Sequence, residues 1–366
     1  MSAENLIEAA LSGHVAVVHE LLNTNGAADV DVRDKINRTP LICAASKGHD
    51  EVVKVLVDAQ AALDAKGIDN LTPLLIAALK GYGSVAQILI DAKAQLDIEN
   101  NMRRTPLHLA AMKGHADVIE RLIHANAMID HEDRDKCSPL MLAAAYGHAH
   151  ILRALIDAKA SIDSVDKDNR SGLLRAVQNG HAEATQVLLD SNANVELKND
   201  SEKTPLIVAV SHGHNPIVRI LIDARANVEA TTSANRTALM LAARRGDAAT
   251  VQALINANAK LESKNIYGST ALLLACSNGH VNVIRALLSA NAILEGHGGS
   301  DYTPLMTAAD SGQVAAVKTL IRGKANAHVV TSDGMSPLML AASTGNGHAA
   351  TVQTLLEIAL AETGTF

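Results

Sequence analysis

A tripeptide that returns every 33 residues constrains this chain more strongly than any other feature of its sequence. The slot reads Thr-Pro-Leu or a close variant in ten copies in unbroken register, which begin at Thr39, Thr72, Thr105, Ser138, Ser171, Thr204, Thr237, Thr270, Thr303 and Ser336. In every copy an Ala follows three residues after the Leu, and a Gly follows four residues after that Ala. A unit of this length cannot bury its apolar face alone, so the repeats are predicted to stack into a solenoid.

Each repeat predicts two helices and a loop. A Thr or Ser side chain caps the first helix, and Pro at the first helical position loses no hydrogen bond because that N–H has no helical partner. The Gly, as at Gly48, ends the helix in a left-handed conformation. A second helix of about 10 residues follows, with an apolar stripe such as Val52, Val53 and Leu56. The polar segment between units, residues 63–71 for example, is predicted to be a hairpin loop.

The repeats extend over nearly the whole chain, so the sequence predicts a single domain of residues 1–366. A degenerate copy at residues 5–22 lacks the Thr-Pro and predicts an N-terminal capping unit at 1–38. Nine internal repeats fill 39–335, and a C-terminal capping unit fills 336–366. Irregular end units are typical of a repeat array.

The amino-acid composition favours a helical protein and gives no sign of nucleic-acid binding. The chain contains no Trp, one Phe and four Tyr, yet 48% of its residues are hydrophobic. The core must therefore consist of Ala, Leu, Ile and Val, which favours closely packed helices over aromatic-centred sandwiches and barrels. The net charge of −7 lacks the global basicity of nucleic-acid-binding proteins. Three cysteines cannot form a disulfide framework, and neither a signal peptide nor an 18-residue apolar run occurs, so a cytoplasmic protein without a transmembrane segment is expected.

The segment RTPLHLAAMKGH, residues 104–115, and its copies resemble the ankyrin repeat. The resemblance covers nearly all of the chain and implies an all-α ankyrin-repeat solenoid of stacked helix-turn-helix units joined by hairpin loops. It also implies that partners dock on the hairpin tips and on the inner face of the first helices. The family's His after the Leu is kept only at His108. Its late turn Gly is replaced by Gln60, Lys93, Asn126, Lys159, Asn192, Arg225, Asn258, Asn291 and Lys324, of which Asn tolerates a left-handed conformation best.

The histidines and cysteines have structural explanations. Eight of the sixteen histidines follow the helix-ending Gly, and the resemblance implies that they bond backbone groups of adjacent units: His14, His49, His115, His148, His181, His214, His280 and His348. One per repeat places them about 10 Å apart, too far to share a zinc ion, so neither a metal site nor a cofactor is expected. Cys43 and Cys276 are predicted to fill first-helix cores. Cys137, in a hairpin, is expected to be exposed and open to reaction, but no His stands at a spacing that would activate it. No catalytic motif occurs, so no enzyme is predicted.

Charge is segregated by position in the repeat. Six positions per repeat face partners in the family: offsets −6, −4, −3 and −1 from the Thr or Ser in the hairpin, and +7 and +8 in the first helix. These 60 positions carry a net charge of +9, so the other 306 residues carry −16. Arg and Tyr are enriched at interface hot spots. The predicted partner-binding residues are Arg33, Lys35, Arg38, Lys47, Arg104, Lys113, Tyr146, Arg170, Arg236, Arg244, Arg245, Tyr267 and Tyr302. The alternative is an ordinary solvated surface, on which an Arg before the Thr only pairs with a neighbouring Asp.

These patterns predict a scaffold that binds a partner protein on its basic concave and hairpin face, with an acidic or phosphorylated segment of the partner as the hypothesis. Two alternatives stay open. One is a bacterial effector or module of a larger assembly that binds host proteins, then in the host cytosol; the other is binding of nucleic acid or anionic lipid through the basic stripe. The chain is expected to be a monomer or to self-associate weakly through its C-terminal cap, where residues 349–360 are rich in apolar side chains.

The repeat at Ser171 is predicted to be a soft spot. Gly172 replaces the Pro, Arg175 stands where most copies have an aliphatic residue or Cys, and Val177 replaces the second Ala. A Gly in the first turn and a larger residue at a close helix contact are each expected to cost about 1 kcal/mol.

Overall fold

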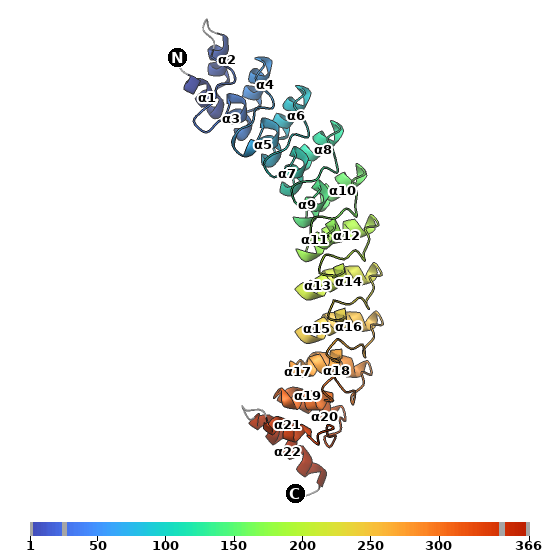
Figure 1. Cartoon of the computed structure of the whole chain (residues 1–366). Coiled ribbons are helices and arrows are strands. Elements are labelled where there is room, and N and C mark those ends of the chain that lie inside the picture. Colours follow the sequence, from blue (N-terminus) through green and yellow to red (C-terminus); the bar gives the residue numbers. More distant parts are fainter. Residues whose placement is uncertain (1–2, 24–27, 344–347, 364–366) are drawn as a thin grey trace. The chain divides into compact units, whose positions relative to one another are not determined.

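The structure is a computed structural model that describes residues 3–23, 28–343 and 348–363. This part of the chain contains 22 α-helices, one 3-10 turn (η1, Ile68–Asn70) and no β-strand. Its only β pairings are two isolated bridges, Val165–Ser171 and Thr231–Thr237, each at the base of a hairpin. The predicted all-α fold of stacked helix-turn-helix units is confirmed (Figure 1).

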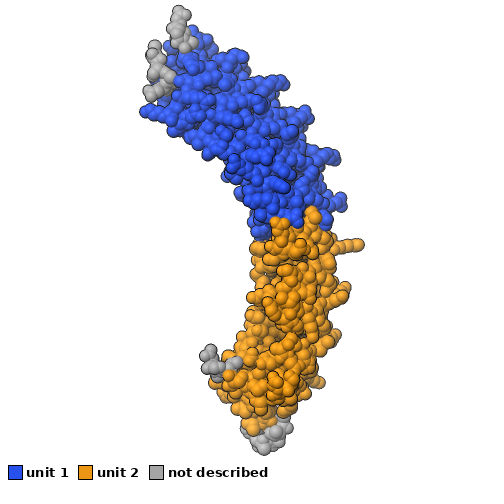
Figure 2. Space-filling model, in the orientation of Figure 1, with its two compact units in different colours: residues 1–194 blue, residues 195–366 orange. Residues whose placement is uncertain are grey.

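The chain divides into two compact units, residues 1–194 and 195–366 (Figure 2). In unit 1 the first helices of successive repeats pack on one another as one layer: α1 (Ala3–Ser12), α3 (Pro40–Lys47), α5 (Pro73–Lys80), α7 (Pro106–Lys113), α9 (Pro139–Ala145) and α11 (Gly172–Gln178). The second helices form the other layer: α2 (Val15–Asn23), α4 (Asp50–Asp58), α6 (Gly83–Asp91), α8 (Ala116–His124), α10 (Ala149–Asp157) and α12 (Ala182–Asp190).

Unit 2 repeats this two-layer arrangement. Its first-helix layer consists of α13 (Pro205–His212), α15 (Ala238–Arg245), α17 (Ala271–Ser277), α19 (Pro304–Asp310) and α21 (Pro337–Ser343). Its second-helix layer consists of α14 (Asn215–Asp223), α16 (Ala248–Asn256), α18 (Val281–Ser289), α20 (Val314–Arg322) and α22 (Ala349–Thr363).

The helices begin and end where the sequence predicts. At α3 the Thr39 hydroxyl accepts a hydrogen bond from the Ile42 N–H at 3.3 Å, and Pro40 occupies the first helical position. Gly48 then ends the helix with φ 73°, a left-handed conformation that costs Gly little because it has no Cβ. The same cap and stop recur along the layer, which fixes the start and length of each first helix.

Small residues let the layers approach closely. Leu41, Cys43 and the pair Ala44–Ala45 on α3 are fully buried, as are Val52, Val53 and Leu56 on α4. Each buried Val or Leu side chain among them contributes about 1.5–3 kcal/mol of hydrophobic stabilisation as an upper estimate. The predicted core of Ala, Leu, Ile and Val is confirmed.

Besides the Gly that ends the first helix, two positions per repeat hold a left-handed backbone. The nine residues that replace the family's late turn Gly all have positive φ, between 61° and 70°. A second series lies two residues before the Thr or Ser, at the hairpin tip, and includes Asn37 and Arg103. An Asn there is favoured over Arg or Lys, because Asn adopts this conformation more readily.

A row of carboxylates links successive repeats through hydrogen bonds. Each accepts a hydrogen bond from the backbone N–H of the residue 31 positions later; for Asp97 and Met128 the distance is 2.9 Å. The row uses Asp in unit 1 and Glu in unit 2: Asp31, Asp64, Asp97, Asp130 and Asp163, then Glu196, Glu229, Glu262 and Glu295. Part of the chain's negative charge is therefore structural.

Candidate partner-binding face

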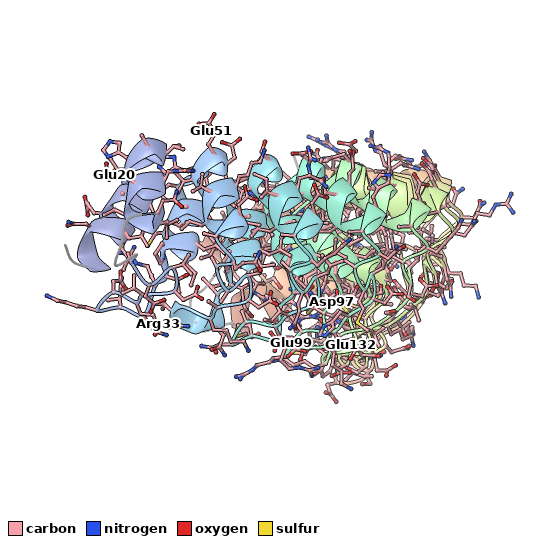
Figure 3. The ribbon with its side chains drawn as sticks, turned by 90° about the horizontal axis from the view of Figure 1, so that it is seen from above. Glu20, Arg33, Glu51, Asp97, Glu99 and Glu132 are labelled. Atoms are coloured by element: carbon pink, nitrogen blue, oxygen red, sulfur yellow. The ribbon has the colours of Figure 1, made fainter. Side chains whose placement is uncertain are left out.

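The candidate site is the face formed by the hairpins and the first helices. Figure 3 shows its hairpin edge in unit 1, where Arg33, Glu99 and Glu132 lie, and the opposite edge of second helices, where Glu20 and Glu51 lie. Of the thirteen predicted partner-binding residues, the eight from Arg33 to Arg170 belong to unit 1 and the five from Arg236 to Tyr302 to unit 2. Each group is considered within its own unit.

The Arg directly before the Thr or Ser is paired with Asp in two hairpins of unit 1. Arg38 Nε donates to Asp34 Oδ2 at 2.8 Å, and Arg170 donates to Asp166 at 2.9 Å and to Asp168 at 2.5 Å. Burial raises the pKa of Asp34, but hydrogen bonds from Arg38 outweigh it and hold that pKa below its ordinary value. These two guanidinium groups are already largely neutralised.

Arg104 reaches the next repeat instead. Its own hairpin has Asn100 where those of Arg38 and Arg170 have Asp, so its Nε donates to Oδ2 of Asp133, 29 residues later, at 3.0 Å. The Asp133 side chain is fully buried, and its other oxygen accepts backbone N–H bonds from Asp135 and Cys137 at 2.8 and 3.0 Å. Arg104 therefore compensates a buried charge between two repeats.

The residue five positions before the Thr or Ser decides which arginines are paired. At Arg236 this residue is Thr232, and in the following repeat it is Asn265, so neither hairpin supplies a carboxylate. Among the described residues Arg236 forms no ion pair. Of the four predicted arginines in this slot, only Arg236 keeps its charge uncompensated.

Arg245 replaces a missing histidine. Asp247 stands in its repeat where most others have His, and its carboxylate caps α16 by accepting the Thr250 N–H at 3.0 Å. The Arg245 guanidinium covers Gly213 and donates to the Ser211 carbonyl, 36 residues before Asp247. The neighbouring Arg244 is exposed and makes no ion pair within the described chain.

The remaining predicted cations of unit 1 are exposed. Lys35, Lys47 and Lys113 form no ion pair with any residue that the structure describes. Arg33 is exposed too, but its guanidinium donates to the Lys66 carbonyl at 2.9 Å and to Asn37. Arg33 and Lys35 line an open groove of about 570 Å³ between the first hairpin and α1, which Glu8 and Asp34 also line. The charge of this groove is mixed.

The three tyrosines differ in exposure. Tyr146 and Tyr267 are 54% and 64% exposed, and the Tyr146 ring stacks on that of His148 with centroids 6.4 Å apart. Tyr302 is half-buried, and burial, with Asp310 and Asp333, raises its pKa. Tyr146 and Tyr267 are available for contact with a partner.

The expected role of the repeat histidines is confirmed at six positions. In each, Nε2 lies within hydrogen-bond distance of a carbonyl in the preceding repeat, for example 3.0 Å between His181 and Ala145; the others are His49, His115, His148, His280 and His348. No group of three or more His, Cys, Asp or Glu side chains in the described residues could hold a metal ion. No helix in the described ranges is long and apolar enough to cross a membrane.

His108 is a buried, neutral histidine. Its Nδ1 accepts the Thr105 N–H at 3.2 Å, and its Nε2 donates to the Cys137 carbonyl at 3.0 Å. Burial lowers its pKa to about 4. His108 therefore links the start of α7 to the next hairpin.

The expectation that Cys137 is exposed is wrong. Its side chain is 2% exposed and packs with Met141, Leu142 and Met112, and Arg175 covers it from the next repeat, with Nη2 2.8 Å from the sulfur. Burial raises the pKa of this thiol to about 11, although the charge of Arg175 lowers it. The thiol at this position is buried under Arg175, whereas three of the four arginines at the same position in other repeats pair with Asp.

Two features of the face escaped the sequence analysis. Lys80 occupies offset +8 on α5, like Lys47 on α3 and Lys113 on α7, and is exposed. The carboxylate row was also missed, although its 33-residue spacing of Asp and then Glu can be read in the sequence. Comparing the residue type at each offset across all repeats reveals both Lys80 and the carboxylate row.

Comparisons with known proteins agree with the geometry. A family model described as ankyrin repeats (3 copies) matches residues 6–100, 92–166, 140–232, 173–265, 226–295 and 291–363, which together cover nearly the whole chain. No curated protein matches the chain as a relative.

Proposed function

Because the chain belongs to the ankyrin repeat family, it is a protein–protein interaction scaffold, and we propose that it binds an acidic segment of a partner on the basic face of its hairpins and first helices. One observation carries this proposal. The 60 partner-facing positions carry a net charge of +9 against −16 on the rest of the chain, and among the described residues this face presents cations without an ion-pair partner: the exposed Lys35, Lys47, Lys113 and Arg244 and the half-buried Arg236. Such a face attracts anionic segments and disfavours cationic ones.

The structure changes which predicted residues support the proposal. Arg38, Arg104, Arg170 and Arg245 are held by carboxylates or a backbone carbonyl of the chain itself. They shape the face, whereas the unpaired cations and the exposed Tyr146 and Tyr267 are proposed to contact the partner.

We further propose that the chain acts without catalysis and in the cytoplasm. Ankyrin repeat proteins are typically non-enzymatic interaction modules, and Cys137 is buried rather than poised to react. Its three cysteines are free and buried, which suits a reducing compartment. Self-association, if it occurs, is proposed to be weak and to use α22, where Leu356 and Leu360 are 44% and 46% exposed.

The test is a pull-down from cell lysate at two salt concentrations, with partners identified by mass spectrometry. The variant carries Lys47→Glu, Lys113→Glu, Arg236→Glu and Arg244→Glu. The matched control carries Lys54→Glu, Arg219→Glu, Arg285→Glu and Lys318→Glu, four exposed cations on second helices. Circular dichroism checks that both remain folded.

A partner kept by the wild type and the control, and lost by the face variant, supports the proposal. Equal capture by all three proteins contradicts the basic face as the binding surface. Capture that disappears after nuclease treatment would instead assign the face to nucleic acid, whose binding falls steeply with salt.

A further inference from the structure

Three lysines form a row on consecutive first helices of unit 1. Lys47, Lys80 and Lys113 are the last residues of α3, α5 and α7, and α5 packs against both of the other helices. All three side chains are exposed, and in the described part of the chain none forms an ion pair. We call this row the lysine ladder.

The ladder is not explained by helix stability. A cation near a helix C-terminus is favoured by up to about 1 kcal/mol, which could select a Lys there. Yet at the same position of the repeat, eight residues after the Thr or Ser, other repeats have Tyr146, Asn179, Asn278 and Ser311, and only α13 and α15 have another basic residue, His212 and Arg245. The fold therefore does not require Lys at this position, and unit 1 has it in three successive repeats.

The helices that carry the ladder supply no opposing charge. Helices α3, α5 and α7 contain no Asp or Glu. Eight residues at 1.5 Å rise separate the ladder from the hairpin end of each helix by about 12 Å. The hairpin carboxylates Asp34 and Asp133 are engaged by Arg38 and Arg104.

The spacing of the ladder selects the shape of a ligand. Packed helices lie about 8–10 Å apart, so successive ammonium groups are about one helix spacing from each other. In the polyproline II conformation a chain rises about 3.1 Å per residue with three residues per turn, so every third side chain lies on the same face and meets a new lysine. A helical ligand would need an apolar groove, but the residues beside the ladder, Ser46, Leu79 and Met112, are half-buried and offer little apolar area.

The chemistry of the ladder suits carboxylates. Lys is a compact point charge that pairs with a singly charged carboxylate, without the bidentate fork by which Arg holds both carboxylate and phosphate groups. No Arg stands in the row. The next position along it is Tyr146, which is 54% exposed and offers an aromatic surface to an apolar side chain.

We propose that the lysine ladder binds a partner segment in the extended polyproline II conformation, with Asp or Glu at every third residue, at positions i, i+3 and i+6, and an apolar residue three positions further on against Tyr146. This rests on the proposed function and specifies the part of the partner that unit 1 reads. Each exposed lysine–carboxylate pair is expected to contribute about three-fold to affinity, and the three together about 30-fold, because sites this far apart act nearly independently.

The experiment selects binders from a random 12-residue peptide library displayed on phage, with the full chain immobilised. The same selection is run with the Lys47→Gln, Lys80→Gln, Lys113→Gln variant and with the single control Lys54→Gln, an exposed lysine on α4. Enriched peptides are sequenced for the spacing of Asp and Glu. The best peptide is then synthesised, and its Kd for each protein is measured by fluorescence anisotropy.

The expected result is enrichment of acidic residues three apart by the wild type and by Lys54→Gln, lost in the triple variant, with a Kd about 30-fold weaker. Acidic residues at another spacing, such as the seven-residue spacing that a helical ligand would show, overturn the proposed extended conformation of the ligand. Equal enrichment by wild type and triple variant, or no enrichment, overturns the ladder as the site. A phosphoserine version that binds at least ten-fold more tightly than the glutamate peptide overturns the assignment to carboxylates. The proposed function fails separately, when the pull-down yields no partner that depends on the basic face.

Discussion

Arg103 and Arg104 are adjacent in the sequence, and the structure predicts that removing their side chains lowers the free energy of unfolding by very different amounts. Arg104 Nε lies 3.0 Å from Oδ2 of Asp133, whose side chain is fully buried. Arg103 pairs with Glu99 at 3.4 Å, and its side chain is 54% exposed. Removing one partner of a buried pair costs about 3–5 kcal/mol, because it strands the other charge. Asp133 keeps two backbone N–H donors, and Arg104 is 22% exposed, so Arg104→Ala is expected at the lower end, about 3 kcal/mol. Arg103→Ala should cost less than about 1 kcal/mol.

The assay is urea unfolding of the full chain, followed by circular dichroism. Arg103→Ala serves as the matched control, since it removes the same side chain one residue away. Adding Asp133→Asn to Arg104→Ala removes the stranded charge and should recover part of the lost free energy of unfolding. Two single variants whose free energies of unfolding differ by less than about 0.5 kcal/mol would refute the reasoning, because a buried pair and an exposed pair cannot cost the same.

Four further predictions follow from particular contacts. Burial raises the thiol pKa of Cys43 and Cys137 to about 11 and also raises that of Cys276, so iodoacetamide at pH 8 should label none of the three in the folded chain. Rapid labelling of Cys137, detected by mass spectrometry, would show that this thiol is accessible. Burial lowers the pKa of His108 to about 4, so as the pH falls from 6.5 the unfolded chain binds a proton before the folded chain does, and up to about 3 kcal/mol of stability is lost by pH 4. Urea unfolding at pH 7 and pH 4.5 should show that His108→Leu lacks this loss. A loss of the same size in the variant contradicts the assignment to His108. A Cβ at Gly172 would lie 2.8 Å from Leu140 Cδ2, so Gly172→Pro should lower the free energy of unfolding by about 1 kcal/mol. Ala238→Pro, at the same helix position, should raise it by about 0.5 kcal/mol. A gain in stability at both positions argues against a steric clash at Gly172. Arg245→Ala should lower the free energy of unfolding by about 1 kcal/mol, because the Ser211 carbonyl loses its donor. Arg244→Ala should change it by less than about 0.5 kcal/mol. If urea unfolding shows a larger loss for Arg244→Ala than for Arg245→Ala, Arg245 does not take the place of the missing histidine.

The fold could be predicted from the sequence because its signals are local and repeated. Thr39 and Gly48 fix the ends of α3 by their own backbone and side-chain chemistry, and the same residue types recur every 33 positions. The stacking then follows, since each repeat must cover the apolar face of its neighbour.

The site was harder to predict because its charges depend on neighbouring repeats. Arg104 and Arg236 occupy the same offset, yet only Arg104 has an Asp in the following hairpin. The charge total over the six offsets therefore includes cations that the chain itself neutralises. An offset-by-offset comparison of adjacent repeats would have separated them.

Contacts across repeats also explain the wrong expectation for Cys137 and the changed role of Arg245. Cys137 is buried because Arg175 of the next repeat reaches over it. Arg245 is structural because position 247 lacks the usual histidine. The predicted soft spot at Ser171 stays a prediction: Arg175 gains an ion pair with Asp166, while Gly172 keeps the conformational freedom of a glycine in the first turn of α11.

The most direct measurement of the central claim is hydrogen–deuterium exchange of the full chain, free and bound to the partner that the pull-down identifies. The account predicts slower exchange on binding in peptides from hairpins and first helices, above all those that contain Lys47, Lys80 and Lys113. Peptides from the second helices α4, α6 and α8 should exchange equally in both states. Protection confined to the second helices would contradict the account, since it would mean that the partner binds the opposite edge of the repeats.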